Sequence, residues 1–178
     1  MVSLGFALLL SIFLTFCGSS PAIAAPSLSA APTAEIAMAK KPLFSFSGKR
    51  PTTLGVTAGK LLACPDTPNC VCSQALDTDK EHKVDAIAYS STPAEAMAKL
   101  KSVVESFELA EVITADEDYL YAEFTTPLMG FVDDVEFYLD RSANVVQVRS
   151  ASRLGKSDLG VNRQRVEAIR SKFSEIGN

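Results

Sequence analysis

The chain has 178 residues, of which 47% are hydrophobic and 21% charged, so we expect a globular protein with a substantial core. It carries 17 Lys and Arg against 21 Asp and Glu, giving a formal net charge of -4. That balance lacks the basic excess with which proteins follow a phosphate backbone, so nucleic acid is excluded as an expected partner. Because the sequence has one histidine, His82, catalytic sites that need paired histidines are excluded. His82 itself could act as a single base or lie in a solvated loop.

The N-terminal region is apolar and uncharged. An apolar run extends from Leu4 to Phe16 and leads to Ala22-Ile23-Ala24, a small-x-small pattern. The run is shorter than the ~20 residues that a membrane-spanning helix needs. We therefore predict a signal peptide over residues 1–24 and an exported protein, with an uncleaved anchor as the alternative because the n-region has no Lys or Arg. Residues 25–60 read as a flexible or irregular leader, and residues 61–178 as a single domain.

The first regular elements follow an irregular segment. Glycines and prolines scattered through residues 43–63 predict extended chain laid on the domain surface. A short strand is expected over residues 84–89. A helix then begins after Thr92, a plausible N-cap with Pro93 at the first helical position and Glu95 at the third.

Four strands and a second helix complete the pattern. Residues 109–114 and 119–125 read as a hairpin with Ile113 opposite Leu120. Residues 132–140 and 145–153 form a second hairpin, in which a four-residue loop sets Asp140 opposite Val145 and Glu136 opposite Arg149. A helix over residues 161–175 closes the chain, its apolar face formed by Val166, Ile169, Phe173 and Ile176. The fold class predicted is α+β, with a four- to five-stranded, mainly antiparallel sheet and two helices packed on one face.

Three cysteines lie close together in the sequence. The prolines and Asn69 between Cys64 and Cys70 favour a tight turn, which predicts a disulfide in an exported protein. Cys72 is left over as a buried thiol, an exchange partner for the bridge or an intermolecular link. A zinc site with His82 is disfavoured because the spacing matches no paired Cys-x-x-Cys pattern, and we predict neither metal nor cofactor.

A second set of polar residues comes from the 132–153 hairpin and the last helix. In this set, arginine side chains and the N-terminal amides of the last helix could receive the negative group of a ligand. The ligand-binding candidates are Arg149, Arg153, Asp158, Asn162, Arg163 and Arg165. The alternative is a salt-bridge network, extended by Arg170, that holds helix to sheet. The acidic members Asp133, Asp134 and Glu136 are candidates for a general base. Asp133 alternates with core residues, so it needs a partner or a place at the strand's end.

An apolar connection joins two of the expected strands at Pro127-Leu128-Met129-Gly130-Phe131. Through Leu128, Met129 and Phe131 it is a candidate for peripheral membrane contact. Alternatively, it folds back and closes the end of the core.

Several blocks of this sequence resemble one family, the domain-of-unknown-function family 1499 (DUF1499). The blocks are Cys64-Pro65, Pro68-Asn69-Cys70-Val71, residues 133–137, residues 148–153, Gly155, residues 158–163 and Arg165. The likeness covers about residues 61–175, and it departs from the family pattern at Cys72, where Ser is expected. The resemblance implies a bacterium or a photosynthetic eukaryote as the source and no settled activity. With the signal peptide, it is compatible with the periplasm or the thylakoid lumen.

Two functions from different classes follow from these residues. The first is a non-catalytic binding or assembly module that contacts an unknown protein or a small anionic or polar ligand. The alternative is a small enzyme with Asp133, Asp134 or Glu136 as general base and arginines stabilising negative charge.

Overall fold

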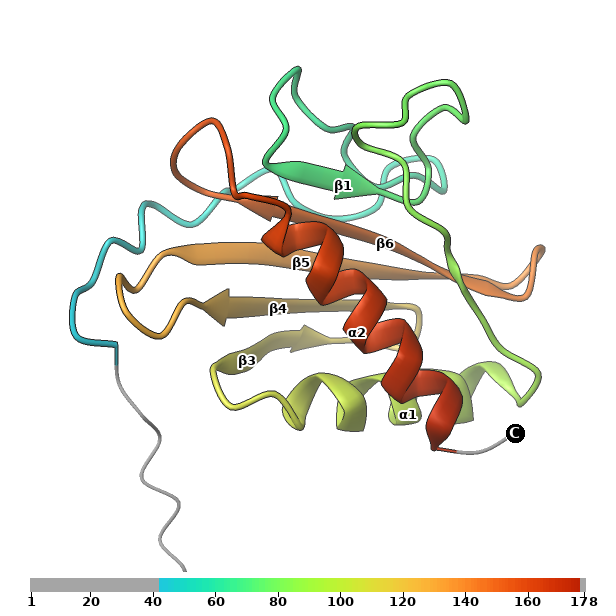
Figure 1. The fold of residues 1–178 in the computed structure, drawn as a ribbon. Coiled ribbons are helices and arrows are strands. Elements are labelled where there is room, and N and C mark those ends of the chain that lie inside the picture. The colour runs from blue at the N-terminus through green and yellow to red at the C-terminus, as the bar shows by residue number, and fades with distance from the viewer. Residues whose placement is uncertain (1–41, 177–178) are drawn as a thin grey trace, which may run out of the picture. The chain divides into compact units, whose positions relative to one another are not determined.

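The protein folds as an antiparallel sheet with two helices on one face (Figure 1). The computed structural model describes residues 42–176, so the predicted signal peptide and residues 25–41 of the leader lie outside the described residues. In chain order the elements are β1 (Cys70–Cys72), β2 (Ile87–Ala88), α1 (Pro93–Glu105), β3 (Ala110–Ala115), β4 (Tyr119–Thr125), β5 (Val132–Asp140), β6 (Val145–Ser152) and α2 (Val161–Glu175). This arrangement confirms the predicted α+β class.

The sheet has six strands, more than the four or five expected. Its order is β1-β6-β5-β4-β3, and β2 also pairs with β6. The additional strand is β1, whose three residues are too few to show an alternating pattern. It pairs antiparallel with β6, placing Cys72 opposite Arg149 and Val71 opposite Ser150.

The β5–β6 hairpin has the predicted register. Asp140 pairs with Val145, Phe137 with Val148, and Glu136 with Arg149. The predicted β3–β4 register was wrong, because β3 carries a bulge between Val112 and Thr114 that sets Ala115 opposite Leu120.

Both helices begin where the sequence predicted, but they are capped differently. At α1, the Thr92 hydroxyl accepts from the Glu95 N–H and the Glu95 carboxylate accepts from the Thr92 N–H, a complete capping box. The N-cap of α2 is Gly160, at a φ of 82°, so no side chain caps from that position. Ile176, predicted on the buried face of α2, lies beyond the helix end and is exposed.

The hydrophobic core lies between the helices and the sheet. It is built from one face of each element, in which every second residue of β4, β5 and β6 points toward the helices. Its buried members include Leu100, Val103, Val104, Leu120, Val135, Phe137, Leu139, Val146, Val148, Val166, Ile169 and Phe173.

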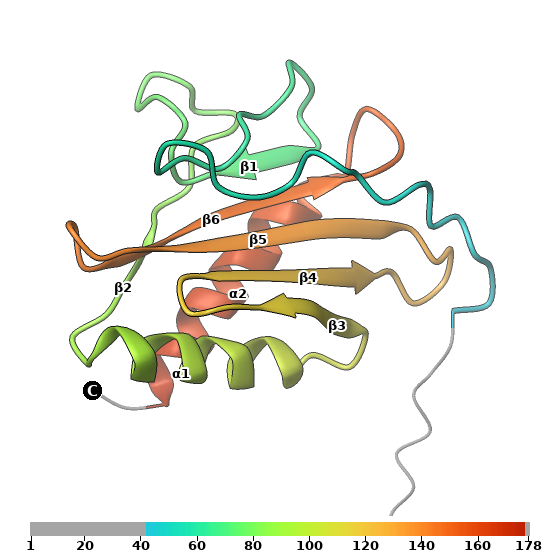
Figure 2. The same cartoon turned by 180° about the vertical axis from the view of Figure 1, so that it is seen from behind.

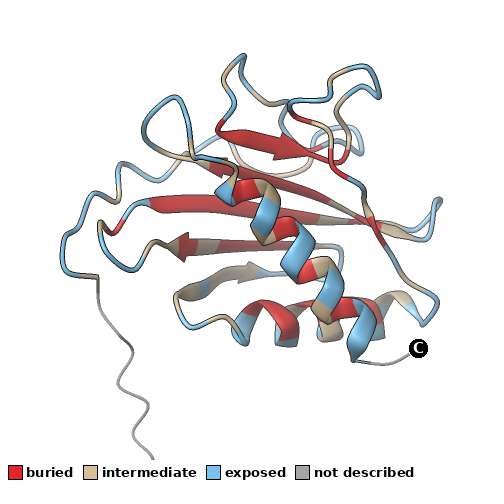
Figure 3. Cartoon of the chain, in the orientation of Figure 1, coloured by how far each residue is buried: buried red, intermediate tan, exposed pale blue. Residues whose placement is uncertain are grey.

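Residues 42–63, which we call the strap, cross part of the second face of the sheet. The strap forms no helix or strand, in agreement with the irregular segment predicted there, and crosses the sheet on the side away from the helices (Figure 2). Because of this cover, β5 is buried along most of its length (Figure 3). Among residues 42–176, no helix is long and apolar enough to cross a membrane.

Candidate functional site

The sheet divides the predicted polar set between its two faces. Strand alternation sends Asp134, Glu136, Arg149 and Arg153 under the strap, while Asp133 points toward the helices. The residues contributed by the start of α2 lie on the helix side as well. The candidates therefore do not form one pocket.

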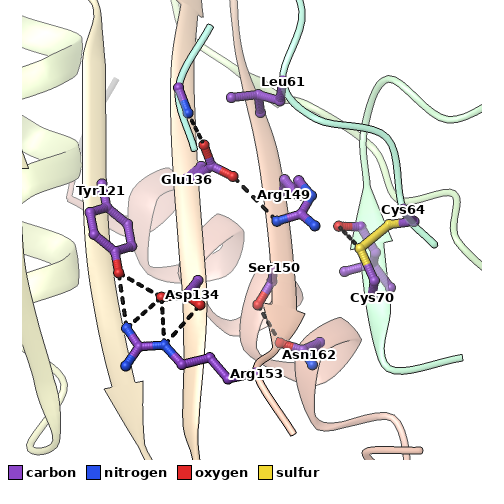
Figure 4. Close-up of polar contacts among 12 residues, drawn as sticks. Leu61, Cys64, Cys70, Tyr121, Asp134, Glu136, Arg149, Ser150, Arg153 and Asn162 are labelled. Atoms are coloured by element: carbon purple, nitrogen blue, oxygen red, sulfur yellow. Dashed lines mark hydrogen bonds and ion pairs between the residues drawn. A yellow bond between two sulfur atoms is a disulfide. The ribbon is translucent and has the colours of Figure 1, made fainter. Parts of the chain in front are cut away.

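Under the strap, Glu136 is the centre of the first group. Its carboxylate is fully buried and accepts from Gly55 N at 2.7 Å, from Tyr119 Oη at 2.9 Å and from Arg149 Nη1 at 3.3 Å. Figure 4 shows the contact between Glu136 and Arg149. Burial, followed by the nearby negative charge of Glu136, raises the pKa of Tyr119. The buried Nε of Arg149 has no hydrogen-bond partner among the described residues. This arginine is thus held mainly by Glu136.

The second group under the strap is built on Arg153. Its guanidinium binds both oxygens of Asp134, with Nε–O distances of 2.9 and 3.1 Å, and contacts Tyr121 (Figure 4). The guanidinium also binds Glu123. Arg50 of the strap binds Glu123 from outside. Burial acts to raise the pKa of Glu123, but the hydrogen bonds from Arg50, Arg153 and Tyr121 outweigh it and lower the pKa. Every charge in this group has an opposite partner.

On the helix side, Asp133 finds the partner that its core position requires. Arg165 of α2 donates to Asp133 Oδ2 at 2.5 Å, and its guanidinium carbon lies 5.0 Å from the centre of the Phe124 ring. The same arginine reaches Asn162 Oδ1 at 2.6 Å. The pair holds α2 against the start of β5.

Asn162 is completely buried at the junction of α2, β6 and the chain before β1. Its amide oxygen accepts from Ser150 Oγ at 2.5 Å, and its amide nitrogen donates to Ser152 Oγ at 2.9 Å and to the Asn69 carbonyl at 3.1 Å. Asp158 caps the helix, since its carboxylate accepts from the N–H groups of Gly160 and Asn162. This network is fully hydrogen-bonded within the protein.

Arg163 and Arg170 project from other sides of α2. Arg163 donates to three backbone carbonyls in the turn at residues 80–83, with a distance of 2.6 Å to the Lys83 oxygen. Arg170 pairs with Glu167 and, at 3.3 Å, with Asp85. Neither arginine joins the group under the strap.

The cysteine cluster forms one bridge and one buried thiol. Cys64 and Cys70 are joined by a disulfide, with their Cα atoms 5.6 Å apart, and this bond ties the end of the strap to β1. Burial raises the pKa of the Cys72 thiol, which opposes formation of the reactive thiolate. Among the described residues, no group of three or more His, Cys, Asp or Glu side chains is arranged to hold a metal ion.

His82 is buried in the turn after β1 instead of standing in solvent. Its Nδ1 lies 2.8 Å from Asp79 Oδ2, and its Nε2 lies 3.2 Å from the Thr67 carbonyl. The hydrogen bond to Asp79 raises the pKa of His82. Both ring nitrogens are therefore engaged within the fold.

The apolar loop between β4 and β5 packs on the strap. The N–H groups of Phe44 and Phe46 donate to the carbonyls of Leu128 and Met129, each at 3.2 Å, and the rings of Phe46 and Phe131 lie 5.8 Å apart. Gly130, at a φ of 65°, lies against the Phe44 carbonyl, where a Cβ would collide. Leu128 and Phe131 nevertheless remain exposed.

A pocket of about 260 Å³ opens beside this loop, between the β4–β5 connection and the β6–α2 connection. Its lining is mainly apolar, with the buried Asp133 and with Ser152 among its few polar groups. The lining residues are Thr126, Phe131, Val132, Asp133, Ser152, Leu154, Gly155, Ser157, Asp158, Leu159 and Val161. Of these, Asp133, Asp158 and Phe131 were predicted from the sequence. Leu154 and Leu159 were not predicted as site residues. The sequence feature that could have indicated them is the presence of two leucines in a loop otherwise rich in Gly, Lys and Ser.

Comparison with known proteins places most of the folded chain in one family. No curated protein matches the sequence significantly. A family model described as a protein of unknown function, DUF1499, matches residues 60–173. The match covers all six strands and nearly all of both helices, and it includes the pocket lining but not strap residues 42–59. The chain belongs to the DUF1499 family.

Proposed function

We propose that this domain is an exported, non-catalytic binding module whose ligand enters the pocket between the β4–β5 and β6–α2 connections. The observation that carries the proposal is the pocket itself, a mainly apolar hollow with Asp133 and Ser152 in its lining. Recessed apolar surface with a few convergent polar groups is the usual form of a small-ligand site. An engineered cavity of about 150 Å³ binds benzene, so this pocket has room for an aromatic ring or a short branched chain.

The ligand class differs from the anionic one suggested by the arginines alone. Arg149, Arg153 and Arg165 are each committed to a buried carboxylate, which leaves their forks occupied. The pocket lining contains Asp133 and Asp158 but no lysine or arginine, and both carboxylates are already engaged, by Arg165 and by the N–H groups of Gly160 and Asn162. These features favour a neutral, mainly apolar ligand.

The enzymatic alternative has less support. Asp133, Asp134 and Glu136 are each bound by an arginine, an arrangement that stabilises the carboxylate charge and joins elements of the fold. Export is supported by the apolar run at residues 4–16, the Ala22-Ile23-Ala24 pattern and the Cys64–Cys70 pair. These features favour the periplasm or the thylakoid lumen, where a disulfide persists.

The pocket is tested with N-phenyl-1-naphthylamine, a neutral apolar fluorophore that carries one N–H donor. We expect saturable fluorescence enhancement with the wild-type chain and at least tenfold weaker binding with Val161→Trp, whose indole would fill the pocket mouth. Leu76→Trp, an exposed position outside this pocket, is the control and should bind like the wild type. Absence of saturable binding, or equal binding by Val161→Trp, would overturn the proposal.

A further inference from the structure

Three segments far apart in the sequence bring exposed apolar side chains to one end of the sheet. They are the start of the strap, the β4–β5 connection and the β6–α2 connection, and both views place them at the same end (Figures 1 and 2). We call these side chains the apolar rim, which consists of Leu43, Phe44, Phe46, Leu128, Phe131, Leu154 and Leu159.

Contacts within the fold link the segments that carry the rim. Backbone hydrogen bonds from Phe44 and Phe46 hold the strap to the β4–β5 connection, and Leu154 lies against Gly48 on the other side. The tips themselves point outward: Leu43 is 77% exposed, Leu128 58% and Leu159 90%. A protein surface rarely keeps such a group of large apolar side chains together unless something covers it.

Basic residues outnumber acidic ones in the segments that carry the rim. The segments 42–50, 126–131 and 153–161 contain four basic residues and one acidic residue, although the whole chain has a net charge of -4. Arg50 and Arg153 pair with Glu123 and Asp134, and the single acid, Asp158, accepts hydrogen bonds at the start of α2. Lys49 and Lys156 are exposed, so two lysines flank the apolar rim.

We propose that the apolar rim docks on an anionic lipid bilayer, with Leu43, Leu128 and Leu159 entering the headgroup region. Apolar tips flanked by the exposed Lys49 and Lys156 fit such a surface, because the tips reach the acyl boundary while the lysines meet anionic headgroups. A second copy of this chain fits less well, since a two-fold contact would bring Lys49 and Lys156 close to the same cations of the partner. Phe131, Leu154 and Leu159 belong both to the rim and to the pocket lining. This inference goes beyond the proposed function because it concerns contact of the outer surface with a bilayer and not the binding of a ligand inside the pocket.

The chain contains no tryptophan, so a single introduced tryptophan reports on one position. The experiment uses the full chain bearing Leu128→Trp, mixed with vesicles of phosphatidylcholine and phosphatidylglycerol whose acyl chains are brominated. We expect strong quenching of the Trp fluorescence. Leu76→Trp, placed at a leucine 75% exposed elsewhere on the surface, should not be quenched. Both proteins carry the same residues 1–41, so a difference between them reports the rim.

Charge reversal tests the second half of the inference. In the Leu128→Trp background, Lys49→Glu with Lys156→Glu should raise the lipid concentration needed for half-maximal quenching at least tenfold. The matched pair Lys60→Glu with Lys80→Glu, also exposed but outside the rim, should leave it unchanged.

Three outcomes would overturn the docking proposal. They are equal quenching at both tryptophans, no quenching at Leu128→Trp, and a Trp emission shift that depends on protein concentration without vesicles, which would indicate self-association. Naphthylamine binding measured without vesicles reports the pocket separately, so the failure of one proposal is distinguishable from the failure of the other.

Discussion

Gly55 donates its backbone N–H to the buried carboxylate of Glu136 across 2.7 Å. A residue with no regular secondary structure therefore helps to satisfy a charge in the middle of the sheet. Arg50 makes a second connection of the same kind, to Glu123 on β4. The strap is held by these two contacts, by the N–H groups of Phe44 and Phe46 on the β4–β5 connection, and by the Cys64–Cys70 bridge at its end.

Removing Arg149 should destabilise the domain strongly. The Arg149→Ala variant leaves Glu136 buried without its cation, so we expect the free energy of unfolding to fall by about 3–5 kcal/mol. Because Arg149 Nε has no hydrogen-bond partner within residues 42–176, the double variant Glu136→Gln with Arg149→Met should recover much of this loss. Urea unfolding measures the free energy of unfolding of both variants. Arg141→Ala, which breaks the exposed ion pair with Glu117, is the control and should lower it by only about 0–1 kcal/mol. Equal losses for Arg149→Ala and Arg141→Ala would contradict this interpretation.

Replacing the buried Asn162 should lower the free energy of unfolding far more than replacing the exposed Gln164 on the same helix. Asn162→Ala leaves Ser150, Ser152 and the Asn69 carbonyl without a shared partner, and an unsatisfied buried group costs about 1–3 kcal/mol. We therefore expect the free energy of unfolding to fall by at least about 1–3 kcal/mol. The control, Gln164→Ala at an exposed position two residues further along α2, should change the free energy of unfolding by less than about 0.5 kcal/mol. Similar effects at both positions would mean that the network is not tightly satisfied in solution.

The disulfide should contribute modestly to stability because it closes a short loop. The pair is separated by six residues in the sequence, for which the chain-entropy model gives about 2 kcal/mol. Cys64→Ala with Cys70→Ala should lower the free energy of unfolding by that amount, and adding a reductant to this variant should have no further effect. A reductant that destabilises the double variant would instead point to a bond involving Cys72.

The ion pair of His82 and Asp79 predicts a definite pH dependence. The hydrogen bond between them raises the pKa of His82 above 6.5 and lowers that of Asp79 below 3.8. Their mutual stabilisation is therefore complete between those ordinary values, and it is lost as the pH rises through the raised pKa of His82. Asp79→Asn should cost more free energy of unfolding at pH 5 than at pH 9.

The same pair can be followed directly, because His82 is the only histidine in the sequence. Its imidazole resonances should titrate above 6.5 in the wild type and at a lower pH in Asp79→Asn. Asp66→Asn, an exposed acid in the preceding turn, is the control and should not move the midpoint. A wild-type midpoint at or below 6.5 would show that the pair does not form.

The elements that the sequence predicted well are those with strong local signals. Thr92, Pro93 and Glu95 specify the start of α1 within four residues, and the four-residue loop before Val145 determines the β5–β6 register. The β3–β4 register could not be predicted from strand alternation, because the pairing shifts between Val112 and Thr114 and no turn residue announces the shift.

The candidate site was predicted less completely than the fold. Strand alternation already separates Asp133 from Asp134, yet it does not reveal that an irregular strap covers the second face and pairs with Glu136. The pocket depends on where the β4–β5 and β6–α2 connections meet in space, which no local pattern in the sequence specifies.

The bulge in β3 has a consequence for how the domain behaves at high concentration. β3 forms one border of the sheet, and a straight border strand offers a row of free N–H and C=O groups to another chain. The shift between Val112 and Thr114 breaks the regular spacing of that row. At the opposite border, β6 is paired by two short strands with a connection between them. Neither border offers a long template, which protects the protein from edge-to-edge aggregation.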